Sequence, residues 1–175
     1  NDVIKMGRTQ LQDAVPIRLG QEFRAYSVAI MRDIHRMEKA MGEMRTLNLG
    51  GTAVGTGLNA DEAYLHRIVP ILSEVSDMDL AQAYDLIDAT QNLDVFVAVS
   101  GAVKACAVTL SKIANDLRLM SSGPRAGLAE INLPAKQNGS SIMPGKINPV
   151  IPEVVNQVAF NIIGNDVTIT MAAEA

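Results

Sequence analysis

The sequence predicts an all-α fold in which long helices pack as a bundle. Apolar residues recur at steps of three and four over long stretches, no stretch alternates as a strand does, and aromatic residues make up only 3% of the chain. Apolar residues at this spacing fall on one face of a helix. We therefore expect four main helical segments, two of them long, with residues 1–175 forming part of one central helical-bundle domain.

The first long helix is expected after an entry segment at residues 1–12. Asp13 is a plausible N-cap, and Pro16 would then lie in the first turn, where proline is tolerated. An apolar stripe follows at Phe23, Tyr26, Ile30, Ile34, Met37, Met41 and Met44. We expect this stripe to lie in the core. The pattern lasts until Gly50, so the helix could approach about 35 residues, a length typical of bundles.

The glycine-rich segment 50–57 ends that pattern. Gly55–Ala60 matches the dinucleotide-binding fingerprint, but no strand is expected before it. A tight reversal between two helices explains the glycines better, which leaves a nucleotide-binding module as the weakest alternative. Asn59 or Asp61 should cap the next, shorter helix, and Pro70 should kink or restart it.

A second long helix is expected after the short helical pieces and turns of residues 77–92. Its main stripe comprises Phe96, Val99, Val103, Cys106, Leu110, Ile113, Leu117 and Met120, and a second face carries small residues. Two apolar faces indicate a helix buried on two sides. Cys106 lies in the stripe and is interpreted as packing. The last helix should begin at Pro149.

Composition narrows the class of protein. The net charge is −4 with both signs mixed, which indicates no nucleic acid and no anionic membrane as partner. A single cysteine excludes an intrachain disulfide and favours the cytoplasm. The most apolar run, residues 95–110, contains Lys104 and is a weak candidate for a membrane span. With 48% hydrophobic residues, we expect a longer polypeptide or partner subunits to cover apolar surface.

The segment 121–149 contains four glycines and four prolines with little periodicity. So long an irregular connection indicates a functional loop. Its run Gly139–Pro149 combines two hydroxyls, Lys146 and an amide, which suits binding of a carboxylate or phosphate. A nucleotide phosphate loop does not fit, because five residues separate Gly139 from Gly145 and Ile147 follows the lysine. A plain surface loop remains the alternative.

The run Gly139–Pro149 resembles the signature loop of the aspartase/fumarase superfamily. Gly7–Ala14 and Gly51–Asn59 resemble two further motifs of that superfamily, and Asn148–Gln157 is most similar to its aspartate-deaminating members. The resemblance implies a carbon–nitrogen lyase that reversibly converts L-aspartate into fumarate and ammonia. It implies a homotetramer with composite active sites, and neither cofactor nor metal. A fumarate hydratase is the sister alternative, and a truncated chain could be an inactive helical assembly module.

The same resemblance implies roles for individual residues. Ser140 would be the general base, acting through an aci-carboxylate intermediate, and loop amides near Gly139 and Ser141 could stabilise its alkoxide. Glu153 would orient its neighbours. The substrate would be held by Thr9, Gln10, Ser141, Ile142, Met143, Lys146 and Asn148.

Two departures from the superfamily pattern matter. Gln10 stands where fumarases have histidine, and because glutamine cannot shuttle protons it argues against the hydratase. The superfamily also draws part of its site from segments that would precede Asn1. We therefore expect these 175 residues alone to form an incomplete site.

Overall fold

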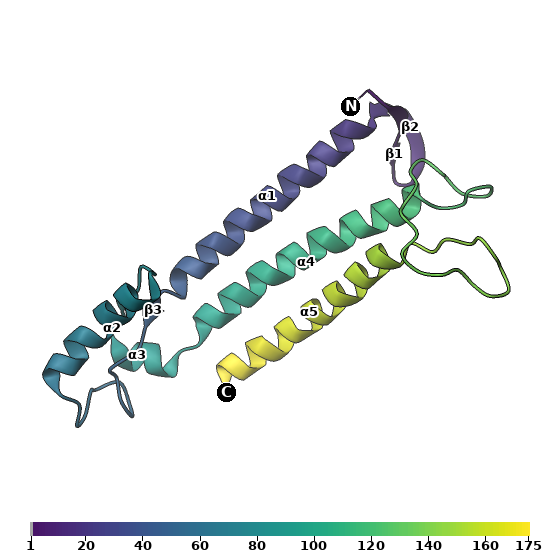
Figure 1. Cartoon of the computed structure of the whole chain (residues 1–175). Helices are drawn as coiled ribbons and strands as arrows, with labels where there is room; N and C mark the ends of the chain where they lie inside the picture. The colour runs from purple at the N-terminus through teal and green to yellow at the C-terminus, as the bar shows by residue number, and fades with distance from the viewer. Residues whose placement is uncertain (1) are drawn as a thin grey trace. The chain divides into compact units, whose positions relative to one another are not determined.

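The computed structural model describes residues 2–175, most of which are helical (Figure 1). The helices are α1 (Leu19–Glu43), α2 (Glu62–Ser76), α3 (Leu86–Gln91), α4 (Asp94–Met120) and α5 (Val150–Glu174). The strands are β1 (Ile4–Thr9), β2 (Gln12–Arg18), β3 (Thr46–Leu47) and β4 (Ala81–Gln82). Two compact units share these elements: Asn1–Ile34 with Lys104–Gly164, and His35–Val103 with Asn165–Ala175.

The expectation of a purely helical chain is wrong for the first residues. β1 and β2 form an antiparallel hairpin whose register runs from the pair Ile4 and Arg18 to the pair Thr9 and Gln12. Asp13 and Pro16 therefore lie in β2, and neither begins a helix. α1 has 25 residues, fewer than expected, because the chain leaves it after Glu43 to enter β3.

The large apolar side chains of the helices point mostly away from the core of the single chain. Phe23 and Met41 of α1 are 47% and 57% exposed, and the buried residues of α1 are Asp33 and Ala40. On α4 the buried positions are mainly small, namely Ala102, Ala107 and Ala114 with Met120. The predicted stripe of α1 is thus not a core within this chain. Of the small-residue face expected on α4, Ala102 is buried, Ala105 and Thr109 are half-buried, and Ala98 is exposed.

The glycine-rich segment leads from β3 into α2 in the second unit. A strand does precede it, contrary to the sequence expectation, and β3 pairs in parallel with β4. Asp61 caps α2 and accepts hydrogen bonds from the amides of Ala63 and Tyr64 at 2.8 and 3.3 Å. The N-terminus of α2, where a nucleotide phosphate would bind, is therefore filled by a side chain.

The fingerprint glycines serve close packing. A Cβ added to Gly55 would lie 2.4 Å from Cα of Ile87, and one added to Gly57 would lie 2.9 Å from the side chain of Leu65. Both glycines also have positive φ, at +87° and +69°. Backbone approach of this kind accounts for the glycines without a ligand. α2 continues through Pro70 without interruption.

α4 and α5 begin where the sequence predicted, and the described residues between them, 121–149, form no helix or strand. By length and composition alone, α4 is long and apolar enough to cross a membrane. Its polar side chains nevertheless bond to α5: within the first unit the Asn156 amide donates to the Ser111 hydroxyl at 2.8 Å. This contact is typical of a helix packed in a protein.

Candidate functional site

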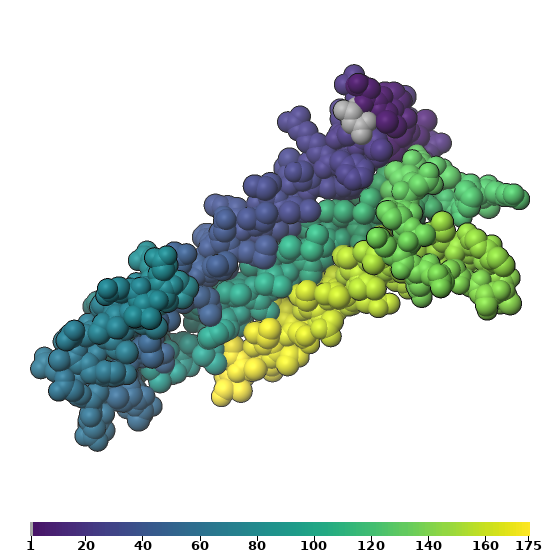
Figure 2. All heavy atoms as spheres, viewed as in Figure 1, coloured from purple at the N-terminus to yellow at the C-terminus, as the bar shows by residue number. Residues whose placement is uncertain are grey.

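Residues 139–146 form a closed loop whose two ends are in contact. A Cβ added to Gly139 would lie 2.2 Å from the carbonyl oxygen of Lys146, so the backbones touch there. Two turns shape the interior, since the Met143 amide donates to the Ser140 carbonyl and the Lys146 amide to the Met143 carbonyl, both at 3.2 Å. Figure 2 shows the green surface of this segment beyond the ends of α4 and α5. The candidate loop is thus a defined ring of backbone.

Ser140 lies at the start of this ring and is half-buried. Its Oγ accepts a hydrogen bond from the amide of Ile142 at 3.3 Å. The sequence analysis expected amides near Gly139 and Ser141 to stabilise the Ser140 oxygen. In the structure the amide that donates to it is that of Ile142. A backbone N–H directed at the oxygen favours its alkoxide over its neutral form.

A cleft of about 690 Å³ lies between the loop and the segment that follows α4. Its lining includes Lys146, Asn148 and Arg118, with no aspartate or glutamate among the described residues that line it. Two cations and several amides without a carboxylate make the cleft suited to an anion. Ser140 is not part of this lining, so the structure brings together only Lys146 and Asn148 of the predicted loop residues.

The base of the cleft is held by a polar contact between α4 and α5. Arg118 Nη1 donates to Oδ1 of the buried Asn156 at 3.2 Å. The Asn156 amide nitrogen donates in turn to the Ser111 carbonyl and hydroxyl at 3.0 and 2.8 Å. This arrangement fixes the start of α5, which carries Glu153 in its first turn. Glu153 itself is exposed, and its amide donates to the Pro149 carbonyl at 3.3 Å.

Thr9 and Gln10 lie at the tip of the β1–β2 hairpin. The two-residue turn between Thr9 and Gln12 consists of Gln10 and Leu11, with φ of 52° and 64°. Glycine and asparagine normally occupy such positions, and other residues cost about 1–3 kcal/mol each. Strain of this size at exposed side chains is typical of functional turns.

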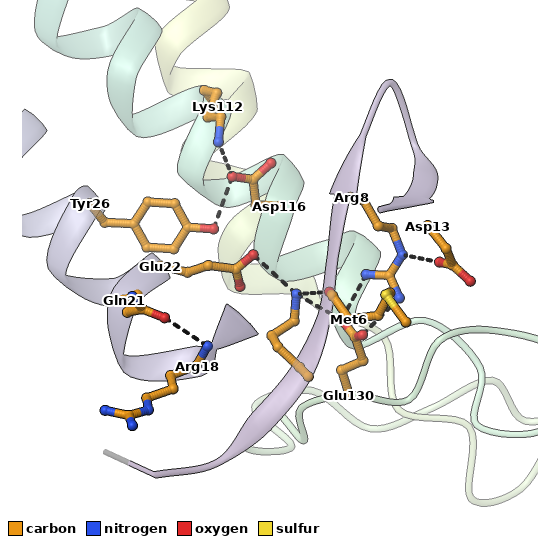
Figure 3. A network of polar contacts seen from close by, with 11 residues as sticks. Met6, Arg8, Asp13, Arg18, Gln21, Glu22, Tyr26, Lys112, Asp116 and Glu130 are labelled. Atoms are coloured by element: carbon orange, nitrogen blue, oxygen red, sulfur yellow. Dashed lines mark hydrogen bonds and ion pairs between the residues drawn. The ribbon is translucent and has the colours of Figure 1, made fainter. Parts of the chain in front are cut away.

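An ion-pair network ties this hairpin to the segment after α4 (Figure 3). Arg8 Nη1 and Nη2 contact the two carboxylate oxygens of Glu130 at 3.0 and 2.7 Å, with side chains only 16% and 14% exposed. Lys5 lies 3.5 Å from Glu130 and 3.0 Å from Glu22. Hydrogen bonding to Arg8 lowers the pKa of Glu130, and the same bond raises the pKa of Arg8.

A second polar contact joins α1 to α4 in the same unit. The Tyr26 hydroxyl donates to Asp116 at 2.9 Å, and Lys112 pairs with the same carboxylate. The Lys112 ammonium also lies 5.4 Å from the centre of the Tyr26 ring. Burial and the bond to Asp116 raise the pKa of Tyr26, so the phenol stays protonated. Neither this contact nor the Arg8–Glu130 pair was predicted.

The lowered pKa of Glu130 predicts how the stability of the hairpin depends on pH. A carboxylate whose pKa is lowered in the folded state stabilises the fold at pH values above its ordinary pKa. This contribution is lost as the pH falls through the lowered pKa. The charges that face it are Arg8 and Lys5, with Glu22 bound to the same lysine. Charge-assisted bonds of this kind contribute about 1.5–3 kcal/mol.

Amide hydrogen exchange of β1 and β2 measures this effect in Glu130→Gln and the wild type. At neutral pH, hairpin amides should exchange about tenfold faster in the variant. The ratio should fall toward one as pH drops through the lowered pKa of Glu130. A ratio that stays constant with pH would show that the charge of Glu130 does not stabilise the hairpin.

Comparison with known proteins shows extensive similarity. The family model described as lyase matches residues 1–164. The chain is 60% identical over 175 residues to the aspartate ammonia-lyase of Bacillus subtilis (strain 168), covering 100% of this chain and 37% of that relative. It is 58% identical over 174 residues to that of Escherichia coli (strain K12), covering 99% of this chain and 36% of that relative.

Solved structures give the same result. A fumarate lyase:delta crystallin from Brucella melitensis bound to cobalt superposes with a TM-score of 0.94 at 57% identity, over 98% of this chain and 37% of that one. A class II fumarase from Schistosoma mansoni superposes with a TM-score of 0.87 at 36% identity, over 98% and 39%. The chain thus spans little more than a third of the length of these relatives.

Proposed function

This chain belongs to the lyase family whose model spans residues 1–164, and on that basis we propose that it is the central helical part of an aspartate ammonia-lyase. The observation that carries the proposal is 60% identity over all 175 residues to an aspartate ammonia-lyase. Identity to the class II fumarase is only 36%. Gln10 also supports deamination over hydration, because glutamine cannot carry a proton between water and the substrate.

The proposed reaction begins with removal of a proton from the carbon next to the side-chain carboxylate of L-aspartate. Ser140, as its alkoxide, accepts that proton, and the electron pair moves onto the adjacent carboxylate to give an aci-carboxylate. The pair then returns to form the carbon–carbon double bond, the carbon–nitrogen bond breaks, and ammonia leaves with fumarate as the other product. A site that lowers this barrier must hold donors around the carboxylate where charge develops.

The loop supplies such donors. Ser141 and the backbone amides of Ile142 and Met143 would bind the reacting carboxylate in the proposed mechanism. Lys146 and Asn148, which both line the cleft beside the loop, would bind the other carboxylate. In comparable sites, each preorganised donor contributes about 10²–10³ in rate.

Residues outside the loop complete the proposed site. Thr9 and Gln10 reach the substrate from the strained hairpin tip of a neighbouring subunit. Thr9 helps to bind the carboxylate that does not react, and Gln10 lies near the leaving amine. Glu153 orients neighbouring groups from the first turn of α5. Because the chain covers 37% of the relative from Bacillus subtilis, other segments of the full-length enzyme would supply further contacts.

Assembly into a homotetramer is part of the proposal. The chain exposes 12456 Å². A compact monomer of 18.7 kDa exposes about 8,300 Å², and two separate bodies of half that mass expose about 10,000 Å² together. Exposed apolar side chains such as Phe23, Met41 and Phe160 lie on the long helices α1 and α5. Helices of neighbouring subunits and of the remaining polypeptide would cover these faces. The single cysteine fits a cytoplasmic enzyme.

Direct assay of the full-length enzyme tests the proposed reaction. Fumarate formation, followed by its ultraviolet absorbance, should occur with L-aspartate and not with L-malate. The reverse reaction should consume fumarate only when ammonia is present. Turnover of malate without turnover of aspartate would replace the proposal with the hydratase, and turnover of neither would favour an inactive assembly module.

A further inference from the structure

The most strongly built polar contact outside the loop is the two-pronged pair between Arg8 and Glu130. Each guanidinium Nη atom donates to a different carboxylate oxygen, at 3.0 and 2.7 Å. Both side chains are largely shielded from water, and the residues lie 122 positions apart in the sequence. A fork of this kind fixes both the distance and the plane of its partner, which a lysine in place of Arg8 could not do.

The backbone beneath Arg8 is shaped to present it. The register of the hairpin shifts between Met6 and Arg8, which marks a bulge at Gly7. A Cβ added to Gly7 would lie 2.8 Å from the Val15 carbonyl oxygen, so the bulge requires glycine. Bulges of this kind redirect a side chain and are common beside active sites. Here the redirected side chain is Arg8, immediately before Thr9.

The other end of the pair, Glu130, lies between two residues that line the cleft beside the loop. Ala129 and Ile131, the residues on either side of Glu130, both line that cleft. The backbone of this stretch is bonded to the end of α4, since the amides of Glu130 and Ile131 donate to the Met120 carbonyl at 2.8 and 3.3 Å. Glu130 is therefore anchored to the end of α4 before it reaches Arg8. The hairpin tip, by contrast, is exposed and holds two non-glycine residues at positive φ.

The geometry points to Glu130 as a positioning residue for the reaction proposed above: through Arg8, it holds the turn that carries Thr9 and Gln10 in its substrate-binding position. This inference rests on the proposed function of those two residues. Glu130 touches no substrate in this role. Its anchored carboxylate fixes Arg8, and Arg8 fixes the turn that directly follows it. Strain in the turn makes such support necessary, because a free tip would relax to other conformations.

Steady-state kinetics of the full-length tetramer with Glu130→Gln test the inference. Thr9 binds the carboxylate that does not react, so its misplacement removes binding shared by substrate and transition state. KM for L-aspartate should rise about tenfold, with kcat changed by less than about threefold. Arg8→Lys should have a similar effect, since it keeps the charge and loses the fork. Asp13→Asn is the matched control, because Asp13 lies 3.5 Å from Arg8 Nε but is 73% exposed.

A double-mutant cycle separates positioning from general support of the fold. If Glu130 acts through the turn, adding Glu130→Gln to Thr9→Val should raise KM by less than about twofold further. An additive effect in this cycle, or a Glu130→Gln enzyme with wild-type KM, would overturn the inference. So would a fall in kcat and in the mass of the assembly with KM unchanged. A wild-type enzyme inactive on aspartate would instead remove the proposed function itself.

Discussion

Replacing Ser140 with alanine should lower kcat for L-aspartate by about 10²–10⁴-fold in the full-length enzyme, because a positioned base contributes a factor of that size. The side chain is half-buried, and its Oγ accepts a hydrogen bond from the backbone amide of Ile142. Its loss should leave the fold unchanged. Fumarate release under saturating aspartate measures kcat, and circular dichroism with mass measurement checks the fold and assembly.

Ser141→Ala is the matched control for that variant. Ser141 is on the same ring but is exposed, and in the proposed mechanism it donates to the carboxylate and does not remove the proton. It should lower kcat by about 10²-fold, within the range for a lost donor. The pH dependence separates the two roles, since only Ser140→Ala removes the ionisation of the base from the rate profile. A Ser140→Ala enzyme that keeps kcat within tenfold of wild type would refute the assigned base.

The second large effect is expected from Gly139→Ala, which changes the point where the two ends of the loop 139–146 touch. The new Cβ would lie 2.2 Å from the Lys146 carbonyl oxygen, far inside contact distance, so the two ends must separate. Lys146 and Asn148 would then shift relative to Ser140. Displacements near 1 Å in a site cost about 10²-fold in rate, so kcat/KM should fall by about that factor.

Gly145→Ala provides a graded comparison at the other end of the same ring. Nothing lies within 4 Å of its added Cβ, but its φ is +85°. Only backbone strain opposes that substitution, and it should lower kcat/KM by about tenfold at most. Because both glycines are exposed, neither variant should shift the midpoint of thermal unfolding appreciably. Equal activity of Gly139→Ala and wild type would show that the contact between the two ends of the loop has no role in catalysis.

The sequence predicts the helices well because their signal is local. Steps of three and four place α4 and α5, and the cap of α2 is Asp61, one of the two residues expected before the apolar run. The β1–β2 hairpin escapes the same reasoning. Its turn is Gln10–Leu11 without glycine or asparagine, and Pro16 within β2 argues against a strand. Pairing across the hairpin, with a bulge at Gly7, overrides these local preferences.

The candidate site was predicted in part. The loop at Gly139–Pro149 is visible in the sequence because its residue types are unusual together, and the structure places Lys146 and Asn148 in one cleft. Arg8 and Glu130 could not be paired in advance, since the chain offers 19 acidic residues and the right one lies 122 positions away. Only the tertiary fold selects that partner.

The contact between Arg118 and Asn156 has a consequence for the connection that it spans. α4 and α5 are held together at the points where residues 121–149 leave and rejoin them. The packing of the two helices therefore offsets the entropic cost of closing that connection. Insertions, deletions and rearrangements in the connection therefore need not unfold the helices. A family with this arrangement can acquire a new substrate by changing the loop between these two helices.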